Sequence, residues 1–180
     1  MAKWIIDPDH AAAEFTVYHM MVTPVHGQFN SVRGAVIFDL ADPGAMSVEV
    51  EIDASVLYTG IERRDNHLRS ADFFDVGKYP LITFKSTAFE VVALNTMNIT
   101  GDLTIHGTIR PVAFKTHFLG PSKFYDDELK QTYTTFGFRA TASINREDFG
   151  MAWNVGIEDG GFMVGKIIDL AFNAEIDLEN

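Results

Sequence analysis

Most of the side chains that could do chemistry are gathered in one short stretch, from Thr59 to Asp75. This stretch contains three arginines, four acids and a histidine. Thr59 followed by Glu62 is a capping-box pattern, which predicts that a short helix begins there. Asp65 and Arg69 would then be neighbours on one face of that helix. We expect the charged helix to plug one end of a barrel, held there by charge-assisted hydrogen bonds, and direct contact with a ligand is compatible with that role.

No arrangement of histidine, serine or glycine matches a known catalytic or metal-binding motif. The histidines form none of the HxH, HxxxH or HExxH patterns, and the chain has neither a Gly-x-Ser-x-Gly elbow nor a phosphate-binding glycine loop. Asp65 and His67 would point to different sides of a helix. We therefore predict no catalytic residues and no metal ligands. The histidines are His10, His19, His26, His67, His106 and His117.

Composition restricts both the class of protein and the class of partner. The chain has 180 residues, nearly half of them hydrophobic and 15 of them phenylalanine, which predicts one globular domain over residues 1–180. The net charge of −11 argues against nucleic acid and anionic membrane surfaces as partners, because both are bound through clustered Lys and Arg. The chain has no cysteine, which excludes disulfides and thiolate metal sites.

The N-terminal residues bear on cellular location. The chain enters Trp4-Ile5-Ile6-Asp7 directly, without the basic region and apolar run of a signal peptide. A complete chain would then be cytoplasmic, and a processed or excised domain would be periplasmic or secreted. No segment approaches the roughly 18 uninterrupted apolar residues of a transmembrane helix, and no aromatic girdle marks the strand ends. We therefore expect a protein that is not integral to a membrane.

The elements that must position any site are β-strands. Residues 47–53 alternate apolar and acidic side chains, and residues 11–20, 133–144 and 164–178 alternate with the same period of two. Residues 25–40 form a longer strand-like segment. Eight principal strands with mostly short connections favour an antiparallel meander, and eight is the number at which a sheet closes into a small barrel. We predict an all-β fold, an eight-stranded antiparallel barrel with one short helix at about 59–75.

An eight-stranded barrel is either filled by its own side chains or encloses one small ligand, and alternation alone leaves both readings open. Four blocks of sequence narrow the choice. They are Trp4-x-Ile6-Asp7-x-x-His10 with Phe15-x-Val17-x-His19; Thr59-Gly60 through Arg64-Asp65-x-His67-Leu68-Arg69-Ser70-x-Asp72-Phe73-Phe74-Asp75 to Tyr79-Pro80; Gly101-Asp102-Leu103-Thr104-Ile105-His106-Gly107 with Arg110-Pro111-Val112; and Asn145-Arg146-x-Asp148-Phe149-Gly150-Met151-x-Trp153-Asn154. In these blocks the chain resembles the YceI-like family, also described as polyisoprenoid-binding, from end to end. Ala11 stands where that family often has serine.

The resemblance implies a lipocalin-like antiparallel barrel with an elongated apolar cavity. Members of the family bind long isoprenoid chains, including polyprenyl compounds and ubiquinone-type quinones, and the family pattern has no established catalytic residues. It therefore implies a non-catalytic carrier that requires no cofactor and binds a long-chain isoprenoid or quinone. The sequence leaves the oligomeric state open, with a homodimer as one option. Two alternatives stay open. One is a surface-binding module for carbohydrate or protein, which would need an exposed Trp or Tyr. The other is an enzyme acting on an isoprenoid lipid through Arg64, Asp65 and His67.

In a carrier of this kind the lipid tail would dominate affinity. Each buried methylene contributes ~0.8 kcal/mol, whereas a head-group hydrogen bond nets only ~1 kcal/mol. The apolar strand faces would therefore bind the tail, and polar residues of the helix and of the late loop would lie near the head group. The expected head-group neighbours are His19, Arg64, His67 and Arg146. The expected tail-binding residues are Phe15, Val17, Val48, Val50, Ile52, Phe84, Phe114, Phe136, Phe138, Ile168, Leu170 and Phe172.

Overall fold

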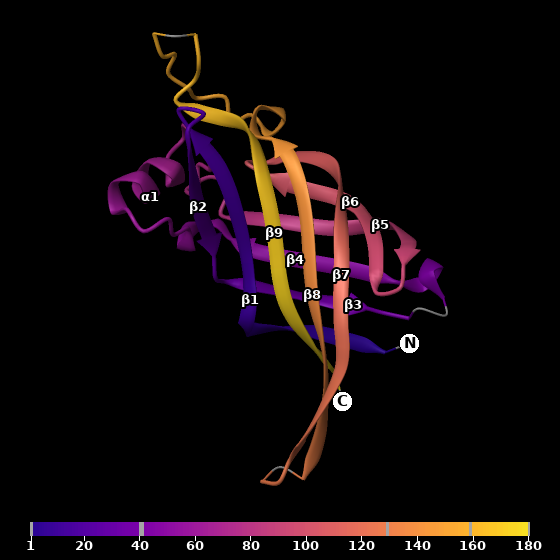
Figure 1. Cartoon of the computed structure of the whole chain (residues 1–180). Helices are drawn as coiled ribbons and strands as arrows, with labels where there is room; N and C mark the ends of the chain where they lie inside the picture. Colours follow the sequence, from indigo (N-terminus) through magenta and orange to yellow (C-terminus); the bar gives the residue numbers. More distant parts are fainter. Residues whose placement is uncertain (1, 40–41, 129, 159, 180) are drawn as a thin grey trace.

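In a computed structural model, which describes residues 2–39, 42–128, 130–158 and 160–179, the chain forms an antiparallel β-barrel with one short α-helix (Figure 1). The helix α1 spans Glu62–Arg69. The strands are β1 (Lys3–His19), β2 (Thr23–Phe29), β3 (Val32–Ile37), β4 (Ser47–Asp53), β5 (Leu81–Ala93), β6 (Thr96–Ile105), β7 (Thr108–Asp126), β8 (Gln131–Asn145) and β9 (Val164–Leu178). The short 3₁₀ turns are η1 (Pro43–Ala45), η2 (Ala54–Val56) and η3 (Arg146–Phe149).

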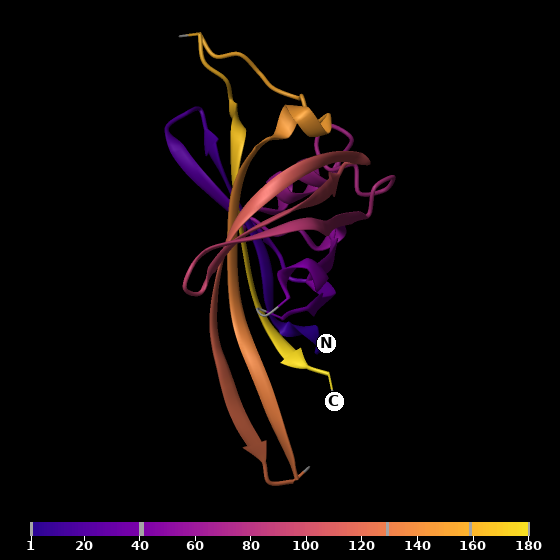
Figure 2. The ribbon, with the colours of Figure 1, turned by 90° about the vertical axis from the view of Figure 1, so that its right-hand side faces the viewer.

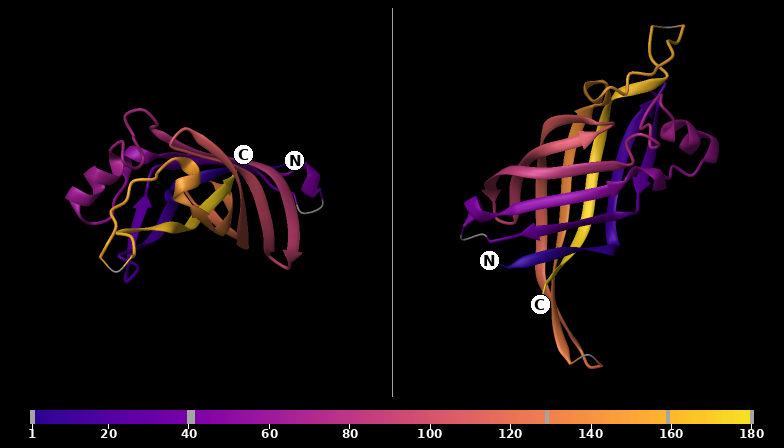
Figure 3. Two further views of the ribbon diagram at one scale, coloured as in Figure 1. Left: turned by 90° about the horizontal axis from the view of Figure 1, so that it is seen from above. Right: turned by 180° about the vertical axis from the view of Figure 1, so that it is seen from behind.

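The barrel closes because β1 pairs with both ends of the sheet. Eight strands follow in the order β1-β3-β4-β5-β6-β7-β8-β9, and β9 pairs back with β1. At the closing seam Trp4 lies opposite Leu178 on β9 and opposite Val36 on β3. Figure 3 shows the ring from above and from behind. Within the described ranges, the predicted fold class, an eight-stranded antiparallel barrel with one short helix, is confirmed.

The predicted single strand at residues 25–40 is wrong, because the structure divides this segment into β2 and β3. β2 pairs with the second half of β1, whereas β3 pairs with its first residues and with β4. The division follows from a bulge in β1, where the register with β9 shifts between Ile6 and Ala11. One straight partner could not follow β1 on both sides of this bulge, so β2 stands outside the ring. Residue 40 lies outside the described residues.

The helix also begins differently from the prediction. Its N-cap residue is Ile61, which makes no side-chain capping bond. The hydroxyl of Thr59 instead donates to the carboxylate of Asp65, inside the helix. Gly60, with a φ of 87°, turns the chain between Thr59 and the helix in a conformation that glycine adopts at little cost. The predicted capping box is therefore absent, and Asp65 fastens the preceding segment to the helix.

α1 and the turn that follows it lie against one end of the barrel, and the hairpin of β7 and β8 extends beyond the other end (Figure 1, Figure 2). Leu68 packs against the main hydrophobic cluster, but Ile61 is 54% exposed. Only the first of these two residues therefore holds the helix to the sheet. Across the described residues, every helix is too short and too polar to cross a lipid bilayer.

Candidate functional site

The inside of the barrel contains an apolar cavity of about 180 Å³. Inward-facing side chains of the barrel strands form most of its wall, and the polar residues in the wall are few. Every predicted tail-binding residue except Phe136 belongs to this wall. The predicted residues that the structure places there are Phe15, Val17, Val48, Val50, Ile52, Phe84, Phe114, Phe138, Ile168, Leu170 and Phe172.

Phe136 packs beside the cavity. Its ring centroid lies 5.1 Å from that of Trp4 and 5.5 Å from that of Phe38, both in edge-on contacts. Aromatic pairs at such distances are favourable beyond their buried area. Alternation along β8 correctly places Phe136 inside the barrel. The rings of Trp4 and Phe38 surround it there, so Phe136 does not line the cavity.

The prediction missed the part of the wall that comes from the segment after α1 and from β6. Phe74 lies in the wall, with its ring 5.4 Å from that of Phe29 and 6.4 Å from that of Phe15. The signal was present in the sequence, since Phe73 and Phe74 are the two adjacent aromatic residues of an otherwise charged stretch. The wall residues missed on β6 are Met97, Ile99, Leu103 and Ile105.

The volume of the cavity bears on what it can hold without rearrangement. An engineered protein cavity of about 150 Å³ with an apolar lining binds benzene and stays free of water, so 180 Å³ corresponds to a ring-sized guest. A longer chain requires wall side chains to rotate. Phe84 and Phe114, whose rings meet edge-on at 5.2 Å, are wall residues on which such a movement would act.

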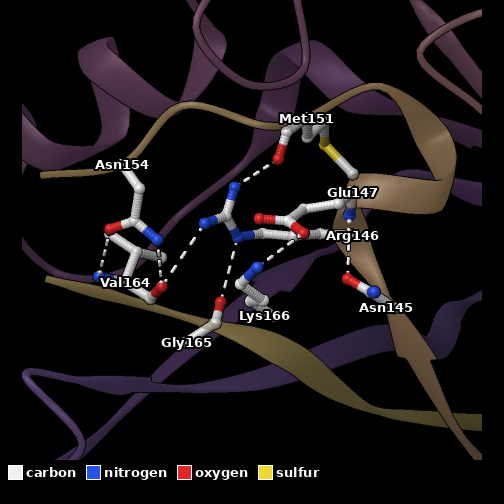
Figure 4. A network of polar contacts seen from close by, with 8 residues as sticks. All are labelled: Asn145, Arg146, Glu147, Met151, Asn154, Val164, Gly165 and Lys166. Atoms are coloured by element: carbon white, nitrogen blue, oxygen red, sulfur yellow. Dashed lines mark hydrogen bonds and ion pairs between the residues drawn. The ribbon is translucent and has the colours of Figure 1, made fainter. Parts of the chain in front are cut away.

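Arg146, the first residue of η3, is a charged residue of this apolar wall. It is 2% exposed. Figure 4 shows its guanidinium surrounded by backbone carbonyls: Nε donates to Gly165 at 2.9 Å, Nη2 donates to Val164 at 3.3 Å and Nη1 donates to Met151. The ring of Phe73 lies 5.9 Å from the guanidinium carbon. These contacts tie η3 to β9 and to the loop between them.

The charge of Arg146 has no ion-pair partner among the residues that the structure describes. The adjacent acid, Glu147, forms its ion pair with Lys166 at 3.0 Å (Figure 4). Burial therefore holds the pKa of Arg146 below its usual value, and the nearby charge of Glu147 acts in the opposite direction. Arg146 is therefore a buried cation that is surrounded by backbone carbonyl dipoles and not by a counter-ion.

The other three predicted head-group neighbours lie away from the cavity wall. His19 is exposed at the end of β1. Arg64 donates to the hydroxyl of Thr59 at 2.7 Å and to its carbonyl at 2.8 Å. His67 is half-buried on α1. Of the four residues, the structure brings only Arg146 to the cavity.

The polar side chains of α1 do not converge on one site. Asp65 is 4% exposed and accepts hydrogen bonds from the backbone N–H of Thr59, at 2.9 Å, and from its hydroxyl. His67 pairs with Asp72 at 2.8 Å. Arg69 donates to backbone carbonyls before the helix, so the expected pairing of Asp65 with Arg69 is wrong. The charge-assisted bonds that hold the helix run to Thr59 and to the backbone.

A second, more polar groove of about 720 Å³ lies outside the barrel, over outward-facing residues of β1, β8 and β9. His26, Arg139 and Tyr58 line it, and Tyr58 is 59% exposed. Its polar groups and open shape distinguish it from the apolar interior.

One group of potential metal ligands occurs among the described residues, at the bulge of β1. Asp7, His10 and Glu175 place one ligand atom each within 4.8 Å of one another, and His10 Nδ1 lies 2.7 Å from a carboxylate oxygen of Asp7. The group is at the surface, where acidic clusters are common without an ion. In this structure it connects the two sides of the bulge.

Comparison with known proteins places this geometry in context. The family model described as YceI-like domain matches residues 4–176. A UPF0312 protein of Pseudomonas savastanoi pv. phaseolicola is 37% identical over 152 residues, which are 83% of this chain and 77% of that protein.

Solved structures show the same fold. BcnA of Burkholderia cenocepacia superposes with a TM-score of 0.78 at 23% identity, over 94% of this chain and 98% of that one. A polyisoprenoid binding domain from Saccharophagus degradans, implicated in plant cell wall breakdown, superposes with a TM-score of 0.68 at 13% identity, over 98% of each chain. At these identities the likeness concerns the fold alone.

Proposed function

The chain belongs to the YceI-like family, and on that premise we propose that it is a non-catalytic carrier, which sequesters a long-chain isoprenoid in its barrel. The lipid would be a polyprenyl or ubiquinone-type molecule. The observation that carries the proposal is the almost wholly apolar cavity inside the barrel. The Saccharophagus degradans neighbour, described as a polyisoprenoid binding domain, supports the choice of ligand class.

The energetics of the cavity favour a ligand with a long apolar tail. Burial of one five-carbon isoprene unit contributes about 3–4 kcal/mol as an upper bound, at ~0.8 kcal/mol per methylene-sized group. A head-group hydrogen bond adds only ~1 kcal/mol. Selectivity among lipids should therefore follow the length and shape of the space that the wall phenylalanines can open.

The arrangement of polar residues supports a carrier rather than an enzyme. A catalytic acid or base must reach the bond that it acts on, and the acid and histidine of α1 are bonded instead to Thr59 and Asp72. Neither Asp65 nor His67 belongs to the cavity wall. Among the described residues of that wall, Arg146 is the strongly buried cation, and it is unsuited to transferring protons because a guanidinium stays protonated.

Mass spectrometry of an organic extract tests the proposal. Protein purified from a host that makes isoprenoids should release a polyprenyl or quinone species in near-stoichiometric amount, while an unrelated soluble protein prepared in the same way should not. Delipidated protein should then take up the identified lipid again. An extract without isoprenoid, together with failure to take up added isoprenoid, would contradict the carrier function and leave the outer groove beside Tyr58 as the alternative binding surface.

A further inference from the structure

The groove outside the barrel is built on a continuous stretch of sheet. β8, β9, β1 and β2 lie side by side there (Figure 1). Tyr58 extends this sheet by one position, because its N–H and its carbonyl both bond to Gln28 of β2 at 3.0 Å. The groove has a volume of about 720 Å³, within the range of roughly 300–1,000 Å³ that small-molecule sites occupy. A ligand bound here would lie across the strands, on a surface separate from the barrel interior.

The strand register arranges the floor of the groove in rows. One row crosses the sheet through paired residues, which are Tyr58, Gln28, Glu14, Ala171 and Thr141. Neighbouring strands lie about 4.8 Å apart, so this row is roughly 19 Å long. Ala171 has only a methyl group as its side chain, and the longer side chains of Glu14 and Thr141 flank it. The outer face of the sheet is therefore hollowed at this point.

A second row provides polar groups that are already held in place. Its members are His26, Thr16, Asp169 and Ser143. The hydroxyl of Ser143 donates to Oδ1 of Asp169 at 2.5 Å, and the hydroxyl of Thr16 lies 3.0 Å from Nδ1 of His26. In the part of the chain that the structure describes, Oδ2 of Asp169 has no hydrogen-bond partner. This row therefore keeps hydrogen-bonding atoms available for a ligand.

The charges of the groove restrict the class of its ligand. Among the described residues, Arg139 has no hydrogen-bond or ion-pair partner, and Glu14 accepts a hydrogen bond from Asn173 at 3.0 Å. The charged groups that line the groove are thus the carboxylates of Glu14 and Asp169, the guanidinium of Arg139 and the titratable imidazole of His26. Nucleic acids and other polyanions bind through clustered cations, which this mixture does not provide. A lipid tail would require an apolar surface, so a polar ligand without a large net charge fits best.

We propose that this outer groove binds a neutral oligosaccharide. Sugar hydroxyls both donate and accept hydrogen bonds, and so do the hydroxyl groups that line the groove. The lining residues with a hydroxyl are Thr16, Tyr58, Thr59, Thr141 and Ser143. Tyr58 is 59% exposed, and its ring offers an apolar face to the C–H face of a sugar ring beside a polar tip. The proposal concerns a second site and does not depend on the carrier function.

The first experiment uses the unaltered protein. Isothermal titration calorimetry compares four neutral oligosaccharides, which are cellohexaose, mannohexaose, maltohexaose and N-acetylchitohexaose. An anionic hyaluronan oligosaccharide and a cationic chitosan oligosaccharide of similar length are the charged probes. We expect saturable binding of at least one neutral oligosaccharide. Protein as purified and protein freed of lipid should bind it equally well, because the groove lies outside the barrel.

The second experiment assigns the binding to the groove. Tyr58→Ala should weaken it by about tenfold or more, since truncation of an aromatic anchor is typically among the most costly changes in a binding site. Thr141→Trp should abolish it, because the indole would fill the floor. Tyr125→Ala is the matched control for the first variant, since Tyr125 is 52% exposed but lies on β7 outside the groove. Ala113→Trp, also on β7 outside the groove, is the control for the second.

Several outcomes would overturn the proposal. Binding of none of the neutral oligosaccharides, or of the charged probes alone, would contradict the ligand class. Binding that persists in both Tyr58→Ala and Thr141→Trp would contradict the position of the site, and so would a sugar that binds only to lipid-free protein, because it would then enter the barrel. Circular dichroism of each variant checks the fold, and if Tyr58→Ala does not fold, Thr141→Trp decides. None of these results bears on the lipid extract, so the two proposals fail separately.

Discussion

Asp65 is the residue of α1 that binds the segment preceding the helix. Its buried carboxylate accepts two hydrogen bonds from Thr59. We expect Asp65→Ala to lower the free energy of unfolding by ~1–3 kcal/mol, because a part-buried backbone N–H and a hydroxyl would lose their acceptor. Urea unfolding followed by circular dichroism measures the change.

Asp72→Ala is the matched control for this prediction. Asp72 also forms a charged hydrogen bond on this segment, to His67, but the side chains of the pair are 47% and 40% exposed. Exposed ion pairs contribute ~0–1 kcal/mol. Equal destabilisation by the two substitutions would mean that Asp65 has no special structural role.

Single residues were predictable from the sequence where strand alternation determines their position. Phe15 and Phe138 reach the cavity wall because every second residue of a barrel strand points inward. The partners of Arg146 and Asp65 were not predictable in this way. Arg146 is bonded to carbonyls from β9, and Asp65 is bonded to Thr59 across a glycine turn, and neither contact follows from a period or a spacing.

Among the elements, the bulge of β1 holds a contact that depends on pH, the hydrogen bond between Asp7 and His10. The hydrogen bond with Asp7 raises the pKa of His10 above its usual 6.5, and the same bond lowers the pKa of Asp7 below its usual 3.8. The contribution of His10 is complete below pH 6.5 and is lost as pH rises through its raised pKa. The contribution of Asp7 is complete above pH 3.8 and is lost as pH falls through its lowered pKa. The contact between Asp7 and His10 should therefore stabilise the bulge most between pH 3.8 and pH 6.5.

NMR titration of the His10 imidazole tests this coupling. In the unaltered protein its midpoint should lie above 6.5, and in Asp7→Asn it should move down, because the amide cannot stabilise the imidazolium by charge. An unchanged His10 midpoint in Asp7→Asn would show that Asp7 does not control this histidine.

The boundaries of elements were less predictable than their type. The sequence indicated the strand character of residues 25–40. The break between β2 and β3, however, follows from a bulge on β1, which lies in a different part of the chain. The start of α1 was misplaced for a similar reason. Thr59 and Glu62 have the spacing of a capping box, and Thr59 is engaged by Asp65 and Arg64 instead.

At the scale of the whole molecule, substitution of Ala140 distinguishes an open interior from a packed one. Ala140 lies on β8 in the cavity wall. Tryptophan in a packed core should destabilise the protein by ~1–3 kcal/mol or more. We expect Ala140→Trp to keep the stability of lipid-free protein nearly unchanged while lowering its lipid content or shifting it to shorter chains, because the indole would occupy space meant for the tail.

Ala113→Trp is the control, because Ala113 is exposed on the outer side of β7 and should alter neither property. Unfolding of delipidated protein and analysis of extracted lipid should be carried out on the same preparations. Strong destabilisation of Ala140→Trp with unchanged lipid content would place Ala140 in packed core and refute the position of the cavity along β8.

The closing seam between β1 and β9 has a consequence for how quickly the barrel can form. Trp4 and Leu178 are separated by nearly the whole sequence, and contacts of such long range make folding slow, because a large loop must close before they stabilise anything. During synthesis β1 cannot pair with β9 until β9 has been made. Until then the apolar faces of the intervening strands stay exposed to other chains. Aggregation therefore competes with closure until the ninth strand arrives, and rapid pairing of β9 with β1 is what ends that exposure.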